Sequence, residues 1–194
     1  MNQPRLDGAT PLDPDEAEAL VPGHIETKAE LNGWEQANIF KAMAWLAERR
    51  SRGSVLSLDF LRDLHKRMFD ETWRWAGQFR TTGKNIGVAA PRIPERVRDL
   101  LADAKFWIER GTYSVDEIGT RFHHRLVSIH PFANGNGRHA RLMTDALLEE
   151  LGGTPFAWGS ASLDAEGATR TAYISALRRA DEGDYTPLMA FVRT

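Results

Sequence analysis

The sequence predicts a mainly α-helical protein, a helical bundle that carries one small β-hairpin flap. Two observations lead to this fold class. Along most of the 194 residues, apolar side chains recur at intervals of three and four, which is the spacing of an amphipathic helix. The exception is residues 78–93, where Gly83, Gly87 and Pro91 interrupt β-compatible residues and predict a hairpin or an extended flap.

An acidic arm is expected before the bundle. Residues 1–30 hold seven acidic residues against two basic ones and include four prolines, so we expect an irregular arm there and a single domain over residues 31–194. The remaining 23 basic and 20 acidic residues leave +3. Such an arm is either a solubilising tail or a segment that folds back over a basic site. The weakly basic body argues against nucleic-acid binding.

The first helices are predicted from apolar spacing and one cap. Residues 35–50 carry apolar residues at helical spacing. Ser57 is suited to cap a second helix, which we expect to run to residue 69. Residues 94–109 repeat the helical pattern.

The next helices have clearer end signals. Ser114 followed by Glu117 forms a capping box that opens a helix over residues 115–129. Residues 138–151 are again helical in pattern and stop at two glycines. The last two predicted helices span residues 163–180 and 187–192.

Composition excludes several classes of protein. The chain is 42% hydrophobic and 27% charged, as in an ordinary globular protein. The lack of cysteine excludes a disulfide scaffold, a zinc–thiolate site and a thiol nucleophile. No apolar stretch approaches the ~18 residues of a membrane-spanning helix, and the first residues show no export signal. We therefore expect a cytoplasmic protein that does not bind membranes.

The segment most suggestive of chemistry is residues 130–141, His-Pro-Phe-Ala-Asn-Gly-Asn-Gly-Arg-His-Ala-Arg. Its Asn-Gly-Asn-Gly run tolerates positive φ and lets backbone N–H groups form an anion-binding concavity where the next helix starts. Arg138 and Arg141 share a helix face beside it, which suits a polyphosphate. His130 has the pKa range of a general base. A tight turn with solvated arginines is the alternative, but so many features within twelve residues favour a phosphate site.

HPFANGNGR resembles the signature of the Fic family, which is His-Pro-Phe-x-(Asp or Glu)-Gly-Asn-Gly-Arg with a further arginine three residues on. Trp75-Ala76-Gly77 with Arg80, and Gly183-Asp184, extend the resemblance over roughly residues 35–192. The whole chain is similar to the Fic subgroup called mobile mystery protein B, which is associated with mobile elements. This resemblance implies a helical fold with a β-hairpin flap.

The resemblance also implies a reaction, the transfer of AMP from ATP to a Ser, Thr or Tyr hydroxyl of a target protein. His130 would take the proton of the target hydroxyl, and Arg138 and Arg141 would neutralise the phosphates. The backbone of the anion loop would cradle the phosphates, with the Asn136 side chain close to them. The loop residues implied are Gly135, Asn136 and Gly137.

Other residues would support this reaction. Pro131 and Phe132 would have structural roles, since Pro131 ends the preceding helix and Phe132 packs inward. Residues 80–88 of the flap would hold the target segment in an extended form through main-chain hydrogen bonds. A small partner protein encoded nearby is implied by the subgroup alone.

One position departs from the family pattern. Asn134 stands where the family has Asp or Glu to hold Mg²⁺. An amide oxygen can ligate magnesium but brings no negative charge. Either the metal is held largely by the phosphates and water, or the use of the nucleotide has changed.

Glu30 invites a hypothesis of autoinhibition. Residues 27–33, Thr-Lys-Ala-Glu-Leu-Asn-Gly, approximate the Ser/Thr-x-x-x-Glu-Gly/Asn inhibitory motif of many Fic proteins, with one residue fewer. A Glu30–Arg141 pair would block the nucleotide. The alternative is a solvated acid at the start of the first helix, favoured there by the helix dipole.

Three other histidines are interpreted as structural. His123 lies two helical turns from His130, too far to share one zinc ion with it, so His123 and His124 are expected to be core or capping residues. His139 is expected to face away from the site.

Three other functions compete with AMP transfer. The first is a Fic-fold transferase that uses another phosphate-linked donor or binds its nucleotide reversed, as a kinase would. The second is a catalytically weak nucleotide-binding module that regulates a partner. The third, a nucleic-acid-binding protein of a mobile element, is least favoured because no basic stripe is present.

Overall fold

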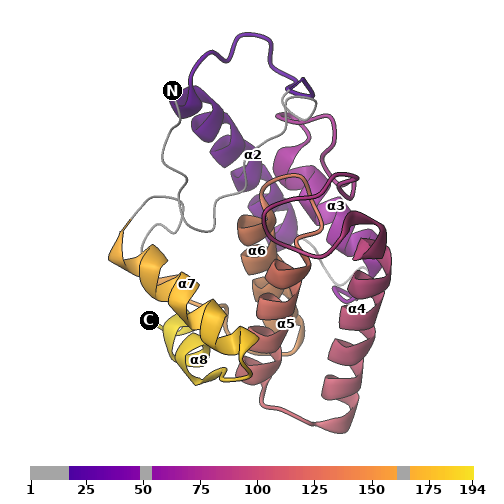
Figure 1. The fold of residues 1–194 in the computed structure, drawn as a ribbon, viewed down its shortest axis with the longest axis vertical. Helices are drawn as coiled ribbons and strands as arrows, with labels where there is room; N and C mark the ends of the chain where they lie inside the picture. The colour runs from indigo at the N-terminus through magenta and orange to yellow at the C-terminus, as the bar shows by residue number, and fades with distance from the viewer. Residues whose placement is uncertain (1–17, 49–53, 161–166) are drawn as a thin grey trace.

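The computed structural model describes residues 18–48, 54–160 and 167–194. In these ranges the chain forms seven α-helices and two short 3₁₀ segments (Figure 1). The α-helices are α2 (Lys28–Glu48), α3 (Leu58–Phe69), α4 (Ile93–Arg110), α5 (Val115–Ile129), α6 (Asn136–Glu150), α7 (Ala168–Asp181) and α8 (Thr186–Val192). The 3₁₀ segments are η1 (Ala90–Arg92) and η2 (Trp158–Ser160). No helix within these ranges is long and apolar enough to cross a membrane.

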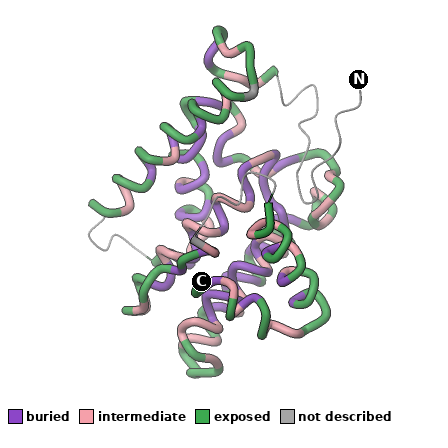
Figure 2. The backbone as a smooth tube through the Cα atoms, turned by 90° about the vertical axis from the view of Figure 1, so that its left-hand side faces the viewer, coloured by how far each residue is buried: buried purple, intermediate pink, exposed green. Residues whose placement is uncertain are grey.

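Helices α5 and α6 form the centre of the bundle. They pack against each other, with α4 beside α5 and with α3 beside α6, while α2 covers α3 (Figure 1). Helices α7 and α8 pack against each other, and α8 packs against α5. Figure 2 shows buried residues along the inward faces of the helices and exposed residues outside. The predicted class of a mainly helical protein is therefore confirmed.

Two of the predicted helix caps are present. The Ser57 hydroxyl accepts a hydrogen bond from the Phe60 N–H at 3.2 Å, and the Ser114 hydroxyl accepts one from the Glu117 N–H at 3.2 Å. Both hydroxyls satisfy N–H groups that a helix start leaves without partners. As a result, α3 and α5 begin where the sequence predicts.

Two predicted helix starts are wrong. Helix α2 begins at Lys28, seven residues before the predicted start at residue 35. The cause is a capping box in which the Glu30 N–H donates to the Thr27 hydroxyl at 3.2 Å and the Thr27 N–H donates to the Glu30 carboxylate at 2.9 Å. Helix α6 begins at Asn136 and not at residue 138, because Gly135 turns the chain with φ +75°.

Other predicted boundaries fall beyond what is described. The predicted helix over 163–180 corresponds to α7, which begins at Ala168, and residues 163–166 lie outside the described residues. The same holds for the predicted end at residue 50 and for residues 1–17 of the predicted arm. Within the arm, Leu20 forms an antiparallel bridge with Trp73. The predicted boundary at residues 30/31 lies inside α2.

The predicted β-hairpin flap is not formed, since residues 78–93, all of them described, contain no strand. The backbone of this loop bonds to the chain between α5 and α6 instead of pairing with itself. The Arg80 N–H donates to the Pro131 carbonyl at 2.9 Å, and the Val88 N–H donates to the Ile129 carbonyl at 3.2 Å. A flap is therefore present as an extended loop, and it is anchored on the motif.

Buried histidines make the fold sensitive to acid. Burial lowers the pKa of His123 to about 3 and the pKa values of His130 and His139 to about 4, and it holds the pKa of His65 well below its usual range. In the opposite direction, burial raises the pKa of Asp145 to about 6.

We expect the free energy of unfolding to fall as the pH drops from 6.5 towards 4. In that pH range the histidines become protonated in the unfolded chain but stay neutral in the folded protein, so the unfolded chain binds more protons. The stability that neutral burial provides is complete above pH 6.5. Because Asp145 opposes the four histidines by one proton, three protons remain and the slope approaches about 4 kcal/mol per pH unit. Urea unfolding at pH 7.5, 6 and 5 measures it, and equal stability at the three pH values would contradict this account.

Candidate functional site

Most of the predicted site residues lie on the connection between α5 and α6 and in the first two turns of α6 (Figure 1). Helix α5 ends because His130 adopts φ +55° and ψ +60°, a left-handed conformation that costs a non-glycine residue about 1 kcal/mol. Its N–H still bonds to the Leu126 carbonyl at 3.2 Å. Pro131 then continues the chain away from the helix. The imidazole of His130 is thus held, 5% exposed, beside the loop.

The loop is closed by the side chain of Asn136. Its Oδ1 accepts the Phe132 N–H and its Nδ2 donates to the Phe132 carbonyl, both at 2.8 Å. The amide is buried, so its contacts are with the loop backbone. The N–H groups at the start of α6 and the helix dipole remain the features that suit an anion. The expectation that the Asn136 side chain lies close to phosphates stays a prediction.

Phe69 forms the floor of the loop. Gly135 has φ +75°, and a Cβ built there would lie 2.5 Å from the Phe69 ring. Only glycine fits this position, because any side chain would meet both an unfavourable φ and a buried aromatic ring. Phe132, a residue of the loop itself, is fully buried and packs inward. The loop is therefore held on buried aromatic rings.

His65 of α3 also holds the loop, and the sequence analysis missed it. Its Nδ1 accepts the Gly77 N–H at 3.0 Å, so the ring proton sits on Nε2 and is donated to the Asn134 carbonyl at 3.1 Å. The ring stacks on Phe132 with centroids 3.6 Å apart. The signal available in the sequence was a lone histidine on the apolar face of the helix predicted over residues 57–69.

Asn134 occupies the position expected to face a metal ion. Its backbone carbonyl is bound by His65, and its side-chain oxygen accepts the Gly135 N–H at 2.5 Å. Within the described part of the chain, no three His, Cys, Asp or Glu side chains form a cluster that could hold a metal ion. The side chain offers one neutral oxygen that is already a hydrogen-bond acceptor.

The buried guanidinium of Arg80 links the flap to the backbone of His130. Its Nε donates to the His130 carbonyl at 2.7 Å, and its two terminal nitrogens donate to the carbonyls of Thr82 at 2.7 Å and Val88 at 2.5 Å. The side chain is 5% exposed. One guanidinium therefore makes the cross-loop bonds that a hairpin would make with its backbone. This explains why the flap keeps its position without a strand.

The same guanidinium shapes the chemistry of His130. Burial, and after it the positive charge of Arg80, lowers the pKa of His130 to about 4, while a hydrogen bond to the Val127 carbonyl opposes the shift. The imidazole is therefore neutral at pH 7 and able to accept a proton. A bound phosphate would raise this pKa, because a nearby negative charge favours the protonated ring.

Gly87 brings the flap directly onto His130. It has φ +99°, and a Cβ there would lie 2.6 Å from the His130 Cβ and 3.0 Å from the Ile129 carbonyl oxygen. These atoms belong to the end of α5 and cannot move aside easily. Glycine is therefore required for the flap to lie this close.

Replacing Gly87 with alanine is expected to lower transfer activity about ten- to hundredfold, because a displacement near 1 Å of a reacting group has effects of that size. The matched control is Gly183→Ala, at φ +93° with open space around its Cβ, which should leave activity unchanged. Initial rates of both variants at saturating nucleotide test this. Equal rates for the two variants would show that contact with His130 is unimportant.

The two arginines lie in different surroundings. Arg138 pairs with Glu35 of α2, with Nη1 2.8 Å from Oε2, and its guanidinium lies over the Phe69 ring at 5.0 Å. The charge of Arg141, one turn further along α6, adds to the burial that lowers the pKa of His123 and opposes the burial that raises the pKa of Asp145. Arg138 thus pairs with α2, whereas Arg141 lies close enough to His123 and Asp145 to act on both.

Glu30 acts at the start of α2. Its carboxylate accepts the N–H groups of Glu26 at 3.0 Å and Thr27 at 2.9 Å, and these bonds lower its pKa. This is the capping role that was the alternative to inhibition. Pairing of Glu30 with Arg141 stays a prediction.

The three histidines interpreted as structural are buried. His123 is fully buried with Nε2 2.7 Å from the Tyr173 hydroxyl, and His139 is fully buried with Nε2 2.9 Å from the Leu61 carbonyl. His124 is 7% exposed and contacts Asp181 at 2.8 Å.

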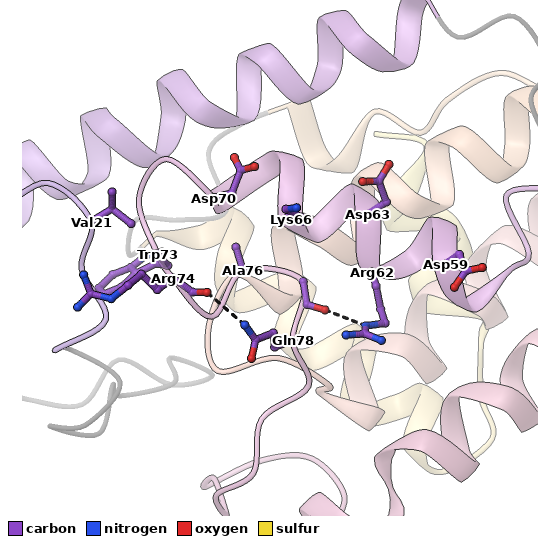
Figure 3. A pocket seen from close by; sticks show the side chains of 11 residues that line it. Val21, Asp59, Arg62, Asp63, Lys66, Asp70, Trp73, Arg74, Ala76 and Gln78 are labelled. Atoms are coloured by element: carbon purple, nitrogen blue, oxygen red, sulfur yellow. Dashed lines mark hydrogen bonds between the residues drawn. The ribbon is translucent and has the colours of Figure 1, made fainter.

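An open pocket of about 520 Å³ lies elsewhere, along α3 (Figure 3). Three aspartates face two arginines and a lysine in it, and Arg62 already donates to the Gly77 carbonyl at 2.9 Å. None of the residues from the 130–141 segment lines it. Its lining is Val21, Asp59, Arg62, Asp63, Lys66, Asp70, Trp73, Arg74, Ala76, Gly77 and Gln78. This balanced charge does not favour a polyphosphate.

Known proteins with similar sequences include protein adenylyltransferases. The chain is 31% identical over 182 residues to a protein named protein adenylyltransferase fic-1 from Caenorhabditis briggsae, a match that covers 91% of this chain and 34% of the relative. The chain thus spans about a third of the length of the curated relatives it matches.

Solved structures agree on the fold. Fic-1 (aa134 - 508) from C. elegans superposes with a TM-score of 0.67 at 25% identity, covering 92% of this chain and 51% of that one. BepC from Bartonella tribocorum, solved with bound AMPPNP, has a TM-score of 0.68 at 19% identity and covers 92% of this chain and 95% of that one. Residues 55–148 match the Fic/DOC family. This chain therefore contains a Fic/DOC family domain, which holds α3, α4, α5, nearly all of α6 and the loop built around His130.

Proposed function

We propose that this protein transfers AMP from ATP to a Ser, Thr or Tyr hydroxyl of a target protein. The observation that carries the proposal is a neutral, buried His130 beside a glycine loop whose N–H groups open α6. The relatives named protein adenylyltransferase and the AMPPNP-bound BepC support the donor and the reaction class.

The chemistry follows from these groups. The His130 imidazole accepts the proton of the target hydroxyl as its oxygen bonds to the α-phosphorus, and the bond from that phosphorus to the bridging oxygen breaks to release pyrophosphate. The backbone N–H groups of Gly135–Gly137 and the dipole of α6 stabilise the phosphate charge, with Arg138 and Arg141 beside them. The reaction is mainly a matter of position and charge, as is usual for phosphoryl transfer.

The flap supplies the surface for the target. Its residues 80–88 lie over His130, and Arg80 fixes them there. An extended target segment along this loop would bring a hydroxyl to His130 through main-chain bonds.

The side chain of Asn134 does not fit the role of a magnesium ligand. It offers a single neutral oxygen that already accepts a hydrogen bond, and such an oxygen is a poor ligand for a hard cation. Any ion that accompanies ATP would be held by the phosphates and water.

The variant Asn134→Asp is expected to lower the Mg²⁺ concentration that gives half-maximal transfer by about tenfold, because a carboxylate adds negative charge and a better oxygen ligand. Magnesium titrations of both proteins at fixed ATP test this. The variant Asn134→Ser, which keeps a neutral oxygen, is the control. Identical magnesium dependence in all three proteins would contradict this role of position 134.

A nucleotide-binding module without transfer activity is the second candidate function. The neutral Asn134 with its engaged oxygen favours it, because a lost metal ligand would slow the chemistry more than the binding. A cytoplasmic location and a small partner encoded nearby stay predictions.

Parallel labelling tests the proposal. The protein is incubated with lysate and with ATP that carries its label on either the α- or the γ-phosphate. Transfer of the α-label alone supports AMP transfer. Transfer of the γ-label alone indicates a kinase-like orientation of the nucleotide, and saturable ATP binding without either label indicates the binding module.

A further inference from the structure

A buried carboxylate from outside residues 55–148 reaches the start of α6. Glu35 of α2 is 4% exposed, and both of its oxygens are engaged. Oε2 lies 2.8 Å from Nη1 of Arg138, and Oε1 accepts a 2.8 Å hydrogen bond from the indole N–H of Trp73. Two separate elements, the segment after α3 and helix α6, therefore meet on one carboxylate of α2.

Arg138 is held on a second side by an aromatic ring. Its guanidinium carbon lies 5.0 Å from the centre of the Phe69 ring, the same ring that lies beneath Gly135. A guanidinium has five N–H donors, and among the described residues only the bond to Glu35 uses them. The side chain is 22% exposed, at the third residue of α6. The Arg138 guanidinium is thus held in place, and most of its N–H groups can still donate to a ligand.

We propose that Glu35 is a positioning residue for Arg138, which it orients at the start of α6 so that the unused N–H groups face the phosphate chain of the nucleotide. The inference rests on the proposed function, because it names what orients one of the two phosphate arginines. Without Glu35, only the Phe69 ring would hold the arginine, and the side chain would lose more freedom of rotation on binding, which weakens affinity.

An inhibitory role for Glu35 is disfavoured by its burial. An inhibitory carboxylate must release its arginine when the nucleotide binds. Its charge then has to be solvated by water. Glu35 is enclosed, and its second oxygen stays bonded to Trp73, so release from Arg138 would leave a buried charge without its partner. Removal of the carboxylate should therefore weaken nucleotide binding if Glu35 positions Arg138, and should strengthen it if Glu35 inhibits.

The test measures dissociation constants by calorimetry, with ATP and with tripolyphosphate as a phosphate-only probe. The variants are Glu35→Gln, Glu35→Asp, Arg138→Gln and the double variant Glu35→Gln/Arg138→Gln. Glu35→Asp keeps the charge and withdraws it by one methylene, so it separates geometry from charge and serves if Glu35→Gln does not fold. Thermal unfolding of each variant establishes that it is folded at the assay temperature.

We expect Glu35→Gln and Arg138→Gln each to weaken binding of both probes about tenfold or more, with a smaller loss for Glu35→Asp. The double variant should bind no more weakly than Arg138→Gln alone, because the two residues act as one unit. The matched control is Lys41→Gln, which removes an exposed ion pair between α2 and Glu71 in the same segment as Trp73. It should bind ATP within about twofold of wild type.

Unchanged or tighter binding by Glu35→Gln would overturn the inference, as would additive losses in the double variant. A purely structural tether would lower the unfolding temperature of Glu35→Gln and leave its affinity unchanged, which also overturns it. AMP transfer is assayed separately. The expected binding pattern without any transfer would refute the proposed function alone, and transfer with normal Glu35→Gln affinity would refute the inference alone. A wild-type protein that binds neither probe would refute both.

Discussion

The variant His130→Ala is expected to transfer AMP about 10²–10⁴-fold more slowly than the wild-type protein, which is the usual contribution of a general base. The buried His130 imidazole is uncharged at pH 7 and can accept a proton. Its removal leaves the target hydroxyl without a proton acceptor. Initial rates of α-label transfer to the target at saturating ATP measure the loss.

Binding and folding should survive this change. The contacts that close the loop come from Asn136, and the anion-binding N–H groups belong to the backbone, so ATP affinity should change by less than about threefold. The control is His24→Ala, which removes an exposed histidine and should leave the rate unchanged. A His130→Ala variant that keeps a wild-type rate would remove His130 from the mechanism.

The variant Gly135→Ala is expected to lose both stability and nucleotide binding. Its Cβ would lie 2.5 Å from the Phe69 ring, and its φ of +75° is unfavourable for alanine. Overpacking and strain together should reduce the free energy of unfolding by about 2–4 kcal/mol. Because the loop has to move, ATP affinity should fall at least tenfold. Urea unfolding and calorimetry measure the two effects.

Two further variants separate the effect of backbone strain from the effect of the contact between residue 135 and Phe69. Gly111→Ala places alanine at φ +58° with open space around its Cβ, so it should cost only about 1 kcal/mol of strain. Phe69→Leu combined with Gly135→Ala gives the new methyl group room and should recover part of the ATP affinity. Equal destabilisation by Gly111→Ala and Gly135→Ala would mean that the contact with Phe69 plays no part.

Helix positions and the central motif could be predicted from the sequence, because the signals that specify them are local. The caps at Ser57 and Ser114 act over three residues, and apolar spacing identifies a helix without knowledge of its neighbours. The early start of α2 was missed although Thr27 and Glu30 form the same kind of box. That box lies before the segment whose apolar spacing indicates a helix, so apolar spacing alone places the helix start too late.

Contacts between distant segments could not be predicted in this way. The flap lacks strands because the Arg80 side chain bonds to carbonyls on both arms of the loop and on His130, and nothing within residues 78–93 reveals that. The same applies to His65 and Asn134, 69 positions apart, and to Glu35 and Arg138, 103 positions apart. Each pair exists only because the bundle packs α2 and α3 against the start of α6.

The most direct test of the site is a crystal structure with a non-hydrolysable ATP analogue. We expect the α-phosphate within hydrogen-bond distance of the N–H groups of Gly135–Gly137 and beside the His130 imidazole, with Arg138 still paired to Glu35. A triphosphate bound away from this loop, for example in the charged pocket along α3 (Figure 3), would contradict the assignment of the site.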